Sequence, residues 1–272
     1  MIEYDNWKSA PMPIALDKKI KETAELGTSQ LFYKYRDVSK NTERMISHRE
    51  LWFAHPKSFN DPFEFKSSIK RMSREAFFNY SADNGVAQEH IEGFWKQYET
   101  VTDEEYKKYI EKIDKDLNET SRVFSMSLVS DSILMWSYYA QSHQGLCFGF
   151  DIAKDFETFN MPFRVEYPDS QERPMIANLD NKNEVGNWNQ HYTKAKCWEH
   201  EQEIRIYKFG ENTNIYCYKH ESLKEIIFGC SMCDQNIDHF SSLIRNKKGF
   251  EHVKLKKAEI DGNLFKLRLV DI

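Results

Sequence analysis

The sequence predicts an α+β protein, and three observations lead to this class. Strand-like segments follow one another through residues 121–272, while helical periodicity is concentrated in residues 69–120. Of the 272 residues, 40% are hydrophobic and only 10 are glycine and 7 proline, which suits one large core. Runs of strands with segregated helices are typical of α+β proteins. We therefore expect a single domain over residues 1–272, with residues 69–120 as a helical insertion within it.

The first elements can be placed from periodicity and turn residues. Residues 17–26 suit a short helix, and residues 31–36 form an aromatic-rich strand bounded by polar turns. Asn41 is placed to cap a helix over residues 42–49. Residues 51–54 then suit a short buried strand.

Amphipathic helices are expected in residues 69–120. The apolar positions that recur with helical spacing are Ala87, Ile91, Phe94 and Tyr98, followed by Tyr106, Ile110, Ile113 and Leu117. Lysine and glutamate are interspersed between these positions, with Glu104 and Lys108 forming one favourable pair four residues apart. We therefore expect the charged residues to form a solvated outer face.

The rest of the chain predicts mainly strands. Residues 123–129 form the first, and a helix beginning near Asp131 or Ser132 follows and ends at Gly145. The later elements are strands at residues 146–152, 163–167, 203–209, 215–218 and 223–228, a helix over residues 237–247 and a hairpin turn at Asp261-Gly262.

Charge and composition exclude several classes of protein. The 38 basic and 43 acidic residues give a net charge of -5, so the chain has no global basic field for binding nucleic acid. No run of 18 apolar residues occurs, and the first 20 residues lack the features of a signal peptide. The 5 cysteines are expected to be reduced thiols. We expect a cytoplasmic protein that does not enter a membrane.

The most informative segment for chemistry is residues 198–207. In a strand, Glu201, Glu203 and Arg205 lie on one face, because side chains alternate with a period of two. Two carboxylates and a guanidinium can hold ribose hydroxyls, bind a metal or stabilise positive charge at an anomeric carbon. The alternative is an exposed strand face on which Arg205 screens its acidic neighbours.

Two further segments place polar groups where a ligand could bind. Alternation turns Ser125 and Ser127 to one side of their strand, with Phe124 and Met126 facing the core. The residues that share one face of the following helix are Trp136, Tyr139 and His143. This face can stack on a nicotinamide or a base, or it can belong to the core.

A basic strand and a cysteine pattern complete the candidates. Lys34 and Arg36 flank Tyr35 and share a strand face suited to a pyrophosphate, with surface charges as the alternative. The four residues spaced like zinc ligands are Cys217, His220, Cys230 and Cys233. The strand at residues 223–228 holds the two pairs apart, so we expect no zinc site.

Several segments together resemble an uncharacterised bacterial and phage family. They are, in chain order, LFYKYR, LWFAHPKSFNDPFEF, FSMS, LMWSYYAQSHQGLCFGF, CWEHEQEIRIYKF and LKEIIFG. They span residues 31–230, with residues 69–120 as a variable insertion. The order of a basic strand, a serine strand and a Glu-x-Glu strand is also distantly similar to ADP-ribosyltransferases.

This resemblance implies a split mixed β-sheet that holds NAD in a cleft, without a metal. Lys34 or Arg36, with Tyr35 between them, takes the basic role, and Ser125 and Ser127 take that of the hydroxyl strand. The resemblance makes Glu203 the catalytic glutamate, whose carboxylate stabilises an oxocarbenium-like transition state. Glu201 then orients the acceptor. The remaining residues expected to contact NAD are Trp136, Tyr139, His143 and Arg205.

The expected function is therefore an NAD-dependent mono-ADP-ribosyltransferase, or an NAD glycohydrolase on the same fold. Such families supply toxins and anti-phage defence effectors, so an antitoxin or defence-system partner and a protein or nucleic-acid acceptor are expected. One alternative is a metal-dependent nuclease with Mg²⁺ held by Asp61, Glu64, Glu201 and Glu203. Another is a noncatalytic module that binds a nucleotide or a partner.

Overall fold

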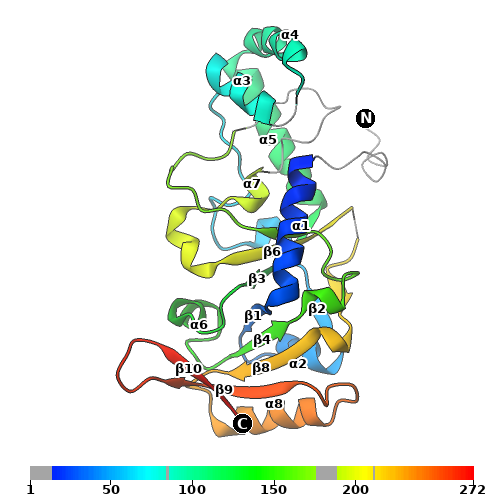
Figure 1. Ribbon diagram of the computed structural model, residues 1–272, viewed down its shortest axis with the longest axis vertical. Coiled ribbons are helices and arrows are strands. Elements are labelled where there is room, and N and C mark those ends of the chain that lie inside the picture. The colour runs from blue at the N-terminus through cyan, green and yellow to red at the C-terminus, as the bar shows by residue number, and fades with distance from the viewer. Residues whose placement is uncertain (1–13, 84–85, 176–188, 211) are drawn as a thin grey trace.

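An eight-stranded mixed sheet forms the centre of the computed structural model, which describes residues 14–83, 86–175, 189–210 and 212–272 (Figure 1). The strand order is β10-β9-β8-β4-β1-β3-β6-β5. Their bounds are β1 Phe32–Arg36, β3 Ser121–Ser127, β4 Leu146–Phe150, β5 Pro162–Arg164, β6 Glu203–Phe209, β8 Leu223–Phe228, β9 Lys254–Ile260 and β10 Leu267–Asp271. Neighbours are antiparallel except β8 and β9, which are parallel. The expected α+β class is confirmed.

Helices cover both faces of this sheet. On one face, α2 (Lys40–Ser47) and α8 (Asp234–Arg245) pack against the larger core, to which alternate residues of β1, β4 and β8 contribute. On the other face, α6 (Ile133–Tyr139) packs its Trp136 against residues of β1, β4 and β8 that point the opposite way. The long helix α1 (Ile14–Ser29) runs alongside β5. None of the described helices is long and apolar enough to cross a membrane.

Residues 69–120 form helices with a core of their own. They are α3 (Arg74–Asp83), α4 (Gln88–Thr100) and α5 (Asp103–Thr120). The buried side chains that these helices share are Met72, Phe77, Ile91, Tyr98, Tyr106 and Ile110. Figure 1 shows α3 and α4 at one end of the molecule, with α8, β9 and β10 at the other. The expected helices are thus present, and we call α3, α4 and α5 the helical lobe.

Local backbone geometry corrects two expected helix boundaries. The helix α2 is capped by Ser39, whose hydroxyl accepts from the Thr42 amide, and not by Asn41. The helix α6 ends at Tyr139, because residues 141–143 have positive φ angles of 48°, 51° and 67°. Gly145 is required for a different reason: a Cβ there would lie 2.1 Å from the carbonyl oxygen of Arg36.

The neighbouring strands β1 and β3 separate almost as soon as they pair. Their single paired position is Tyr33 opposite Ser127. Four residues earlier on β3, Val123 instead exchanges both main-chain hydrogen bonds with Ala54, at 2.7 and 2.8 Å. Ala54 follows the short strand β2 (Glu50–Trp52), which pairs with β7 (Ile215–Cys217) in a separate sheet. The segment around Ala54 therefore takes the edge of β3 that β1 would otherwise occupy, and an opening forms between β1 and β3.

Candidate functional site

The opening between β1 and β3 is a cavity of about 360 Å³. Pockets of roughly 300–1,000 Å³ are the usual size for small-molecule sites. The residues that line it are Tyr33, Lys34, Tyr35, Arg36, Trp52, Ala54, Ser58, Phe59, Asn60, Glu64, Val123, Ser125, Met126, Met135, Tyr139, Lys194, Glu201 and Glu203. Arg36, Ser125 and Glu203 thus border one cavity, although they are far apart in the sequence. None of the lining residues belongs to the helical lobe.

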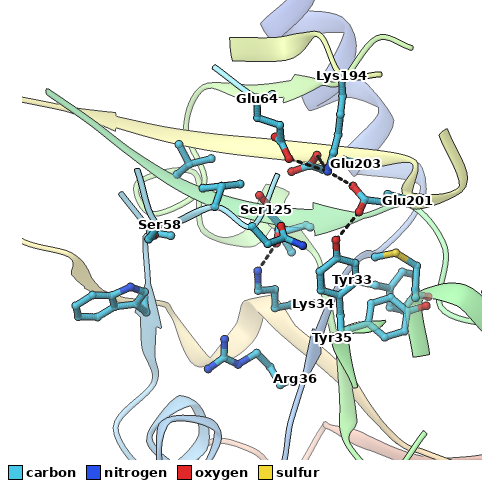
Figure 2. Close-up of a pocket in the computed structure, with 18 residues that line it drawn as sticks. Tyr33, Lys34, Tyr35, Arg36, Ser58, Glu64, Ser125, Lys194, Glu201 and Glu203 are labelled. Carbon is cyan, nitrogen blue, oxygen red and sulfur yellow. Dashed lines mark hydrogen bonds and ion pairs between the residues drawn. The ribbon is translucent and has the colours of Figure 1, made fainter. Parts of the chain in front are cut away.

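Three buried carboxylates meet at one end of this cavity, around the ammonium group of Lys194. Figure 2 shows Glu64, Glu201 and Glu203 converging on this group. The Lys194 Nζ lies 2.5 Å from Glu201 Oε2, 3.1 Å from Glu64 Oε1 and 3.6 Å from Glu203 Oε2. Tyr139 donates a hydrogen bond of 2.6 Å to the other oxygen of Glu201. Each of these carboxylates is less than 10% exposed, so the pairing with a cation offsets much of their desolvation.

Arg205 completes this cluster from behind the cavity. Its guanidinium is fully buried and donates two hydrogen bonds of 2.9 Å to the two oxygens of Glu203. It also contacts Glu64. Burial alone would raise the pKa of Glu203, but Arg205 and Lys194 together lower it to about 2. Glu203 is therefore ionised at neutral pH.

The neighbouring groups are also fixed in their protonation states. The pKa of Lys194 is raised although its burial acts to lower it, because Glu203, Glu64 and Glu201 surround the ammonium group. Burial and the hydrogen bond to Glu201 raise the pKa of the Tyr139 hydroxyl. Lys194 is thus charged and Tyr139 is a neutral donor at neutral pH. Burial, together with the charge of Glu203, outweighs both cations for Glu64 and raises its pKa.

Two basic side chains from β1 supply the opposite charge to the cavity. Figure 2 shows Lys34 and Arg36 pointing into it, apart from the carboxylates. The Lys34 ammonium donates a 2.7 Å hydrogen bond to the main-chain carbonyl of Ser125, across the gap where β1 and β3 have separated. Arg36 has a buried Nε without a hydrogen-bond partner. Within the described part of the chain, neither residue forms an ion pair with a carboxylate.

Burial without a carboxylate partner among the described residues lowers the pKa of Lys34. Burial is the main cause, and the charge of Arg36 adds to it, so that the pKa of Lys34 falls to about 7 although Glu203 and Glu201 act to raise it. Burial likewise lowers the pKa of Arg36. An anion placed beside Lys34 and Arg36 would remove this cost. The cavity therefore has an end built for negative charge and an end built around three carboxylates.

The structure brings most of the expected site residues to this cavity. Those that line it are Lys34, Tyr35, Arg36, Ser125, Tyr139, Glu201 and Glu203. Glu203 and Arg205 share a face of β6 as expected, but Glu201 does not belong to this strand. It ends a 3₁₀ turn over Lys196–Glu201, and Gln202 follows with a φ of 43°. This turn, and not strand alternation, brings Glu201 next to Glu203.

Four expected ligand contacts lie outside the cavity lining. Ser127 is fully buried, and its hydroxyl donates to the main-chain carbonyl of Glu201 at 2.6 Å. Arg205 is shielded by Glu203. Trp136 belongs to the core and donates to the Ser130 carbonyl. His143 lies beyond the end of α6 and stacks on Trp136. None of these four residues lines the cavity, and Ser127 and Trp136 donate their hydrogen bonds to main-chain carbonyls instead.

Sequence reasoning missed Lys194 and Trp52, and placed Glu64 only in a metal site. Lys194 precedes a turn, so no periodicity relates it to Glu201. Trp52 belongs to the strand at residues 51–54 that was expected to be buried, yet it is 57% exposed at the cavity. A tryptophan that alternates with the buried residues Leu51 and Phe53 is the one signal that indicated an outward-facing position.

The donor set does not suit the divalent metal of the nuclease hypothesis. Glu64, Glu201 and Glu203 do converge, but Lys194 and Arg205 are already paired with them, and the Lys194 ammonium lies where a cation would bind. The fourth expected ligand, Asp61, accepts a hydrogen bond from the Phe63 amide and does not line the cavity. In the ranges that the structure describes, no group of His, Cys, Asp or Glu side chains is arranged to hold a metal ion.

The comparison with protein families gives one match. Residues 135–206 match the model of a family described as "Protein of unknown function (DUF2971)". The matched segment supplies five of the cavity residues: Met135, Tyr139, Lys194, Glu201 and Glu203. The resemblance to an uncharacterised family is thereby confirmed. No curated protein and no solved structure matches the chain.

Proposed function

We propose that the cavity binds NAD and that the protein cleaves its nicotinamide glycosidic bond, as a mono-ADP-ribosyltransferase or an NAD glycohydrolase. The observation that carries this proposal is the separation of charge within one cavity. Lys34 and Arg36 lack carboxylate partners in the described ranges, whereas Glu203 is held ionised, and Glu201 accepts a hydrogen bond from Tyr139, at the other end of the cavity. NAD carries the matching charges, because its pyrophosphate is negative and its nicotinamide ring is positive.

The order of groups along β3 supports this orientation. Ser127 of β3 is paired with Glu203, the Ser125 carbonyl binds Lys34, and Val123 marks the end closed by Ala54. A pyrophosphate beside Lys34 and Arg36 then places the nicotinamide ribose toward Glu203. The separation of β1 from β3 also supports the resemblance to the ADP-ribosyltransferase fold, in which NAD lies in a split sheet.

The proposed reaction needs only groups already in this cavity. The bond between the ribose C1′ and the nicotinamide nitrogen breaks, and both electrons of the bond go to the nitrogen, so nicotinamide leaves as a neutral molecule. Glu203 stabilises the positive charge that develops on the sugar through a hydrogen bond to a ribose hydroxyl. Water or an acceptor group then bonds to C1′. The proton that the water or acceptor group releases passes to Glu201. The oxygens of Glu201 retain free lone pairs beyond those that accept from Tyr139 and Lys194.

An effector role, as a toxin or in defence against phage, belongs to the same proposal, and it rests on the resemblance alone. The acceptor distinguishes the two activities, and one experiment tests both. Purified protein is incubated with adenylate-labelled NAD, with and without a cell lysate, and free nicotinamide and label transfer are measured. Release with transfer supports the transferase, and release without transfer supports the glycohydrolase. No release under either condition would contradict the proposal.

A further inference from the structure

The cavity has a third wall that the proposed chemistry does not use. It is formed by residues 52–60, of which Trp52, Ser58 and Asn60 are exposed and line the cavity. Leu51 and Phe53, on either side of Trp52, are fully buried in the core. Alternation therefore turns the indole outward, on the same side of the segment as Ala54.

The indole ring of Trp52 is open to solvent at the cavity. In the described part of the chain it makes no aromatic or cation–π contact, and the residue is 57% exposed. A large aromatic side chain held open at a ligand-sized cavity exposes apolar area that a flat ring can cover. Lys34 and Arg36 border the same cavity, so a flat ring bound here would be attached to an anionic group.

Geometry separates Trp52, at one end of this wall, from the carboxylates. Trp52 belongs to the segment that binds β3 at Val123, whereas Glu203 is paired with Ser127 of β3. Four residues of extended strand span about 13 Å. One ring cannot contact both ends, so a ligand that fills the cavity has two end groups and an anionic linker.

We propose that Trp52 stacks on the purine base of the ligand and that the wall of residues 52–60 is a nucleoside subsite. This inference rests on the proposed function, because it takes NAD as the occupant and assigns its adenine to Trp52. The indole stacks on the flat face of the base. Every base has such a face, so the contact supplies affinity more than base selectivity.

Calorimetric titration of the full chain with NAD and with nicotinamide mononucleotide tests the subsite. Trp52→Ala is expected to weaken NAD binding about 5- to 100-fold, as loss of one base-stacking contact does. Its affinity for the mononucleotide, which lacks adenine, should be unchanged, and Trp52→Phe should retain most of the NAD affinity. Phe265→Ala removes a fully exposed ring outside the cavity and serves as the control.

The outcomes separate the subsite from the proposed function. If wild-type protein binds NAD and Trp52→Ala binds it equally well, the base subsite is wrong and the proposed function stands. Equal losses for NAD and the mononucleotide would also overturn the subsite. If wild-type protein binds neither ligand, both proposals fail together.

Discussion

Lys34 is the residue through which pH acts most directly on this cavity. Its ammonium bridges the gap between β1 and β3 to the Ser125 carbonyl, and it has no carboxylate partner in the described ranges. Burial and Arg36 lower its pKa from 10.5 to about 7. Lys34 is therefore charged below pH 7 and loses its proton as the pH rises above it, which couples its charge to the binding of an anion.

Binding of NAD should weaken as the pH rises from 7 to 9. Below pH 7 Lys34 is already charged, whereas above it the binding of an anion must first take up a proton, so affinity falls by at most tenfold per pH unit. Titration of wild-type protein at several pH values measures this. Lys34→Met should bind weakly and without this slope, and Lys112→Met, which replaces an exposed lysine of α5 outside the cavity lining, should behave as wild type. A flat profile for wild type from pH 6 to 9 would contradict the assignment.

The same residue predicts a change in stability. Below pH 7 Lys34 is charged in both the folded and unfolded chain, so the full cost of burying its charge is present. Between pH 7 and about 10 only the folded chain has lost the proton, and that cost disappears. The free energy of unfolding of wild type, compared with Lys34→Met by urea titration, should therefore rise over this range. A difference that stays constant with pH would show that Lys34 is not a buried cation.

At the scale of elements, strand periodicity predicted much of the sheet. The bounds of β6 and β8 agree with the residues expected, and β1 differs by a single residue. The order of the strands and the parallel pairing of β8 with β9 could not be predicted, because alternation specifies which face is buried and not which strand lies beside it. The opening between β1 and β3 depends on Ala54 pairing with Val123, a long-range contact without a local signal.

The site residues likewise divide into those that strand periodicity predicts and those that it does not. Residues on strands, such as Lys34, Arg36, Ser125 and Glu203, could be predicted because a period of two places them. The placement of His143 on the helix that carries Trp136 and Tyr139 was wrong, since the positive φ angles of residues 141–143 end that helix before it. Lys194 has no sequence signal, because its place among the carboxylates is set by the turn at Lys196–Glu201.

The helical lobe should lose its structure without loss of the sheet. Tyr98 is 1% exposed in the core of the lobe, and its hydroxyl accepts from the Met72 amide. Tyr98→Ala is expected to cost about 3–5 kcal/mol within the lobe, as other large-to-small aromatic changes do. Hydrogen exchange followed by mass spectrometry should show faster exchange in residues 74–118 and unchanged protection in β1, β4 and β8. Equal acceleration throughout would show that lobe and sheet unfold as one unit.

At the scale of the whole molecule, the arrangement leaves the cavity near the middle of the sheet and the helical lobe at one end. The net charge of -5 does not attract an anionic ligand, so the positive end of the cavity must do so locally. Two cations from one strand, without ion-pair partners among the described residues, and three carboxylates from other segments meet only because the chain folds around the opening between β1 and β3. The proposed activity is thus a property of the assembled sheet and not of any one segment.

Glu203 cannot be altered without a cost in stability. The residue is 4% exposed and its carboxylate is bound by Arg205, and removal of one partner from a buried ion pair costs about 3–5 kcal/mol. Glu225 is a matched control, since it is 6% exposed, is paired with Lys256 at 2.7 Å and lies outside the cavity. Both variants are compared at a temperature at which circular dichroism shows them folded.

The rate of nicotinamide release from NAD by Glu203→Gln, relative to Glu225→Gln and wild type, tests the central claim most directly. The account predicts that Glu203→Gln loses about 10²- to 10³-fold in rate, because it removes the charge that stabilises the transition state, while Glu225→Gln stays near wild type. Addition of a divalent-metal chelator should change none of these rates. Full release by folded Glu203→Gln, or abolition of wild-type release by the chelator, would contradict the account.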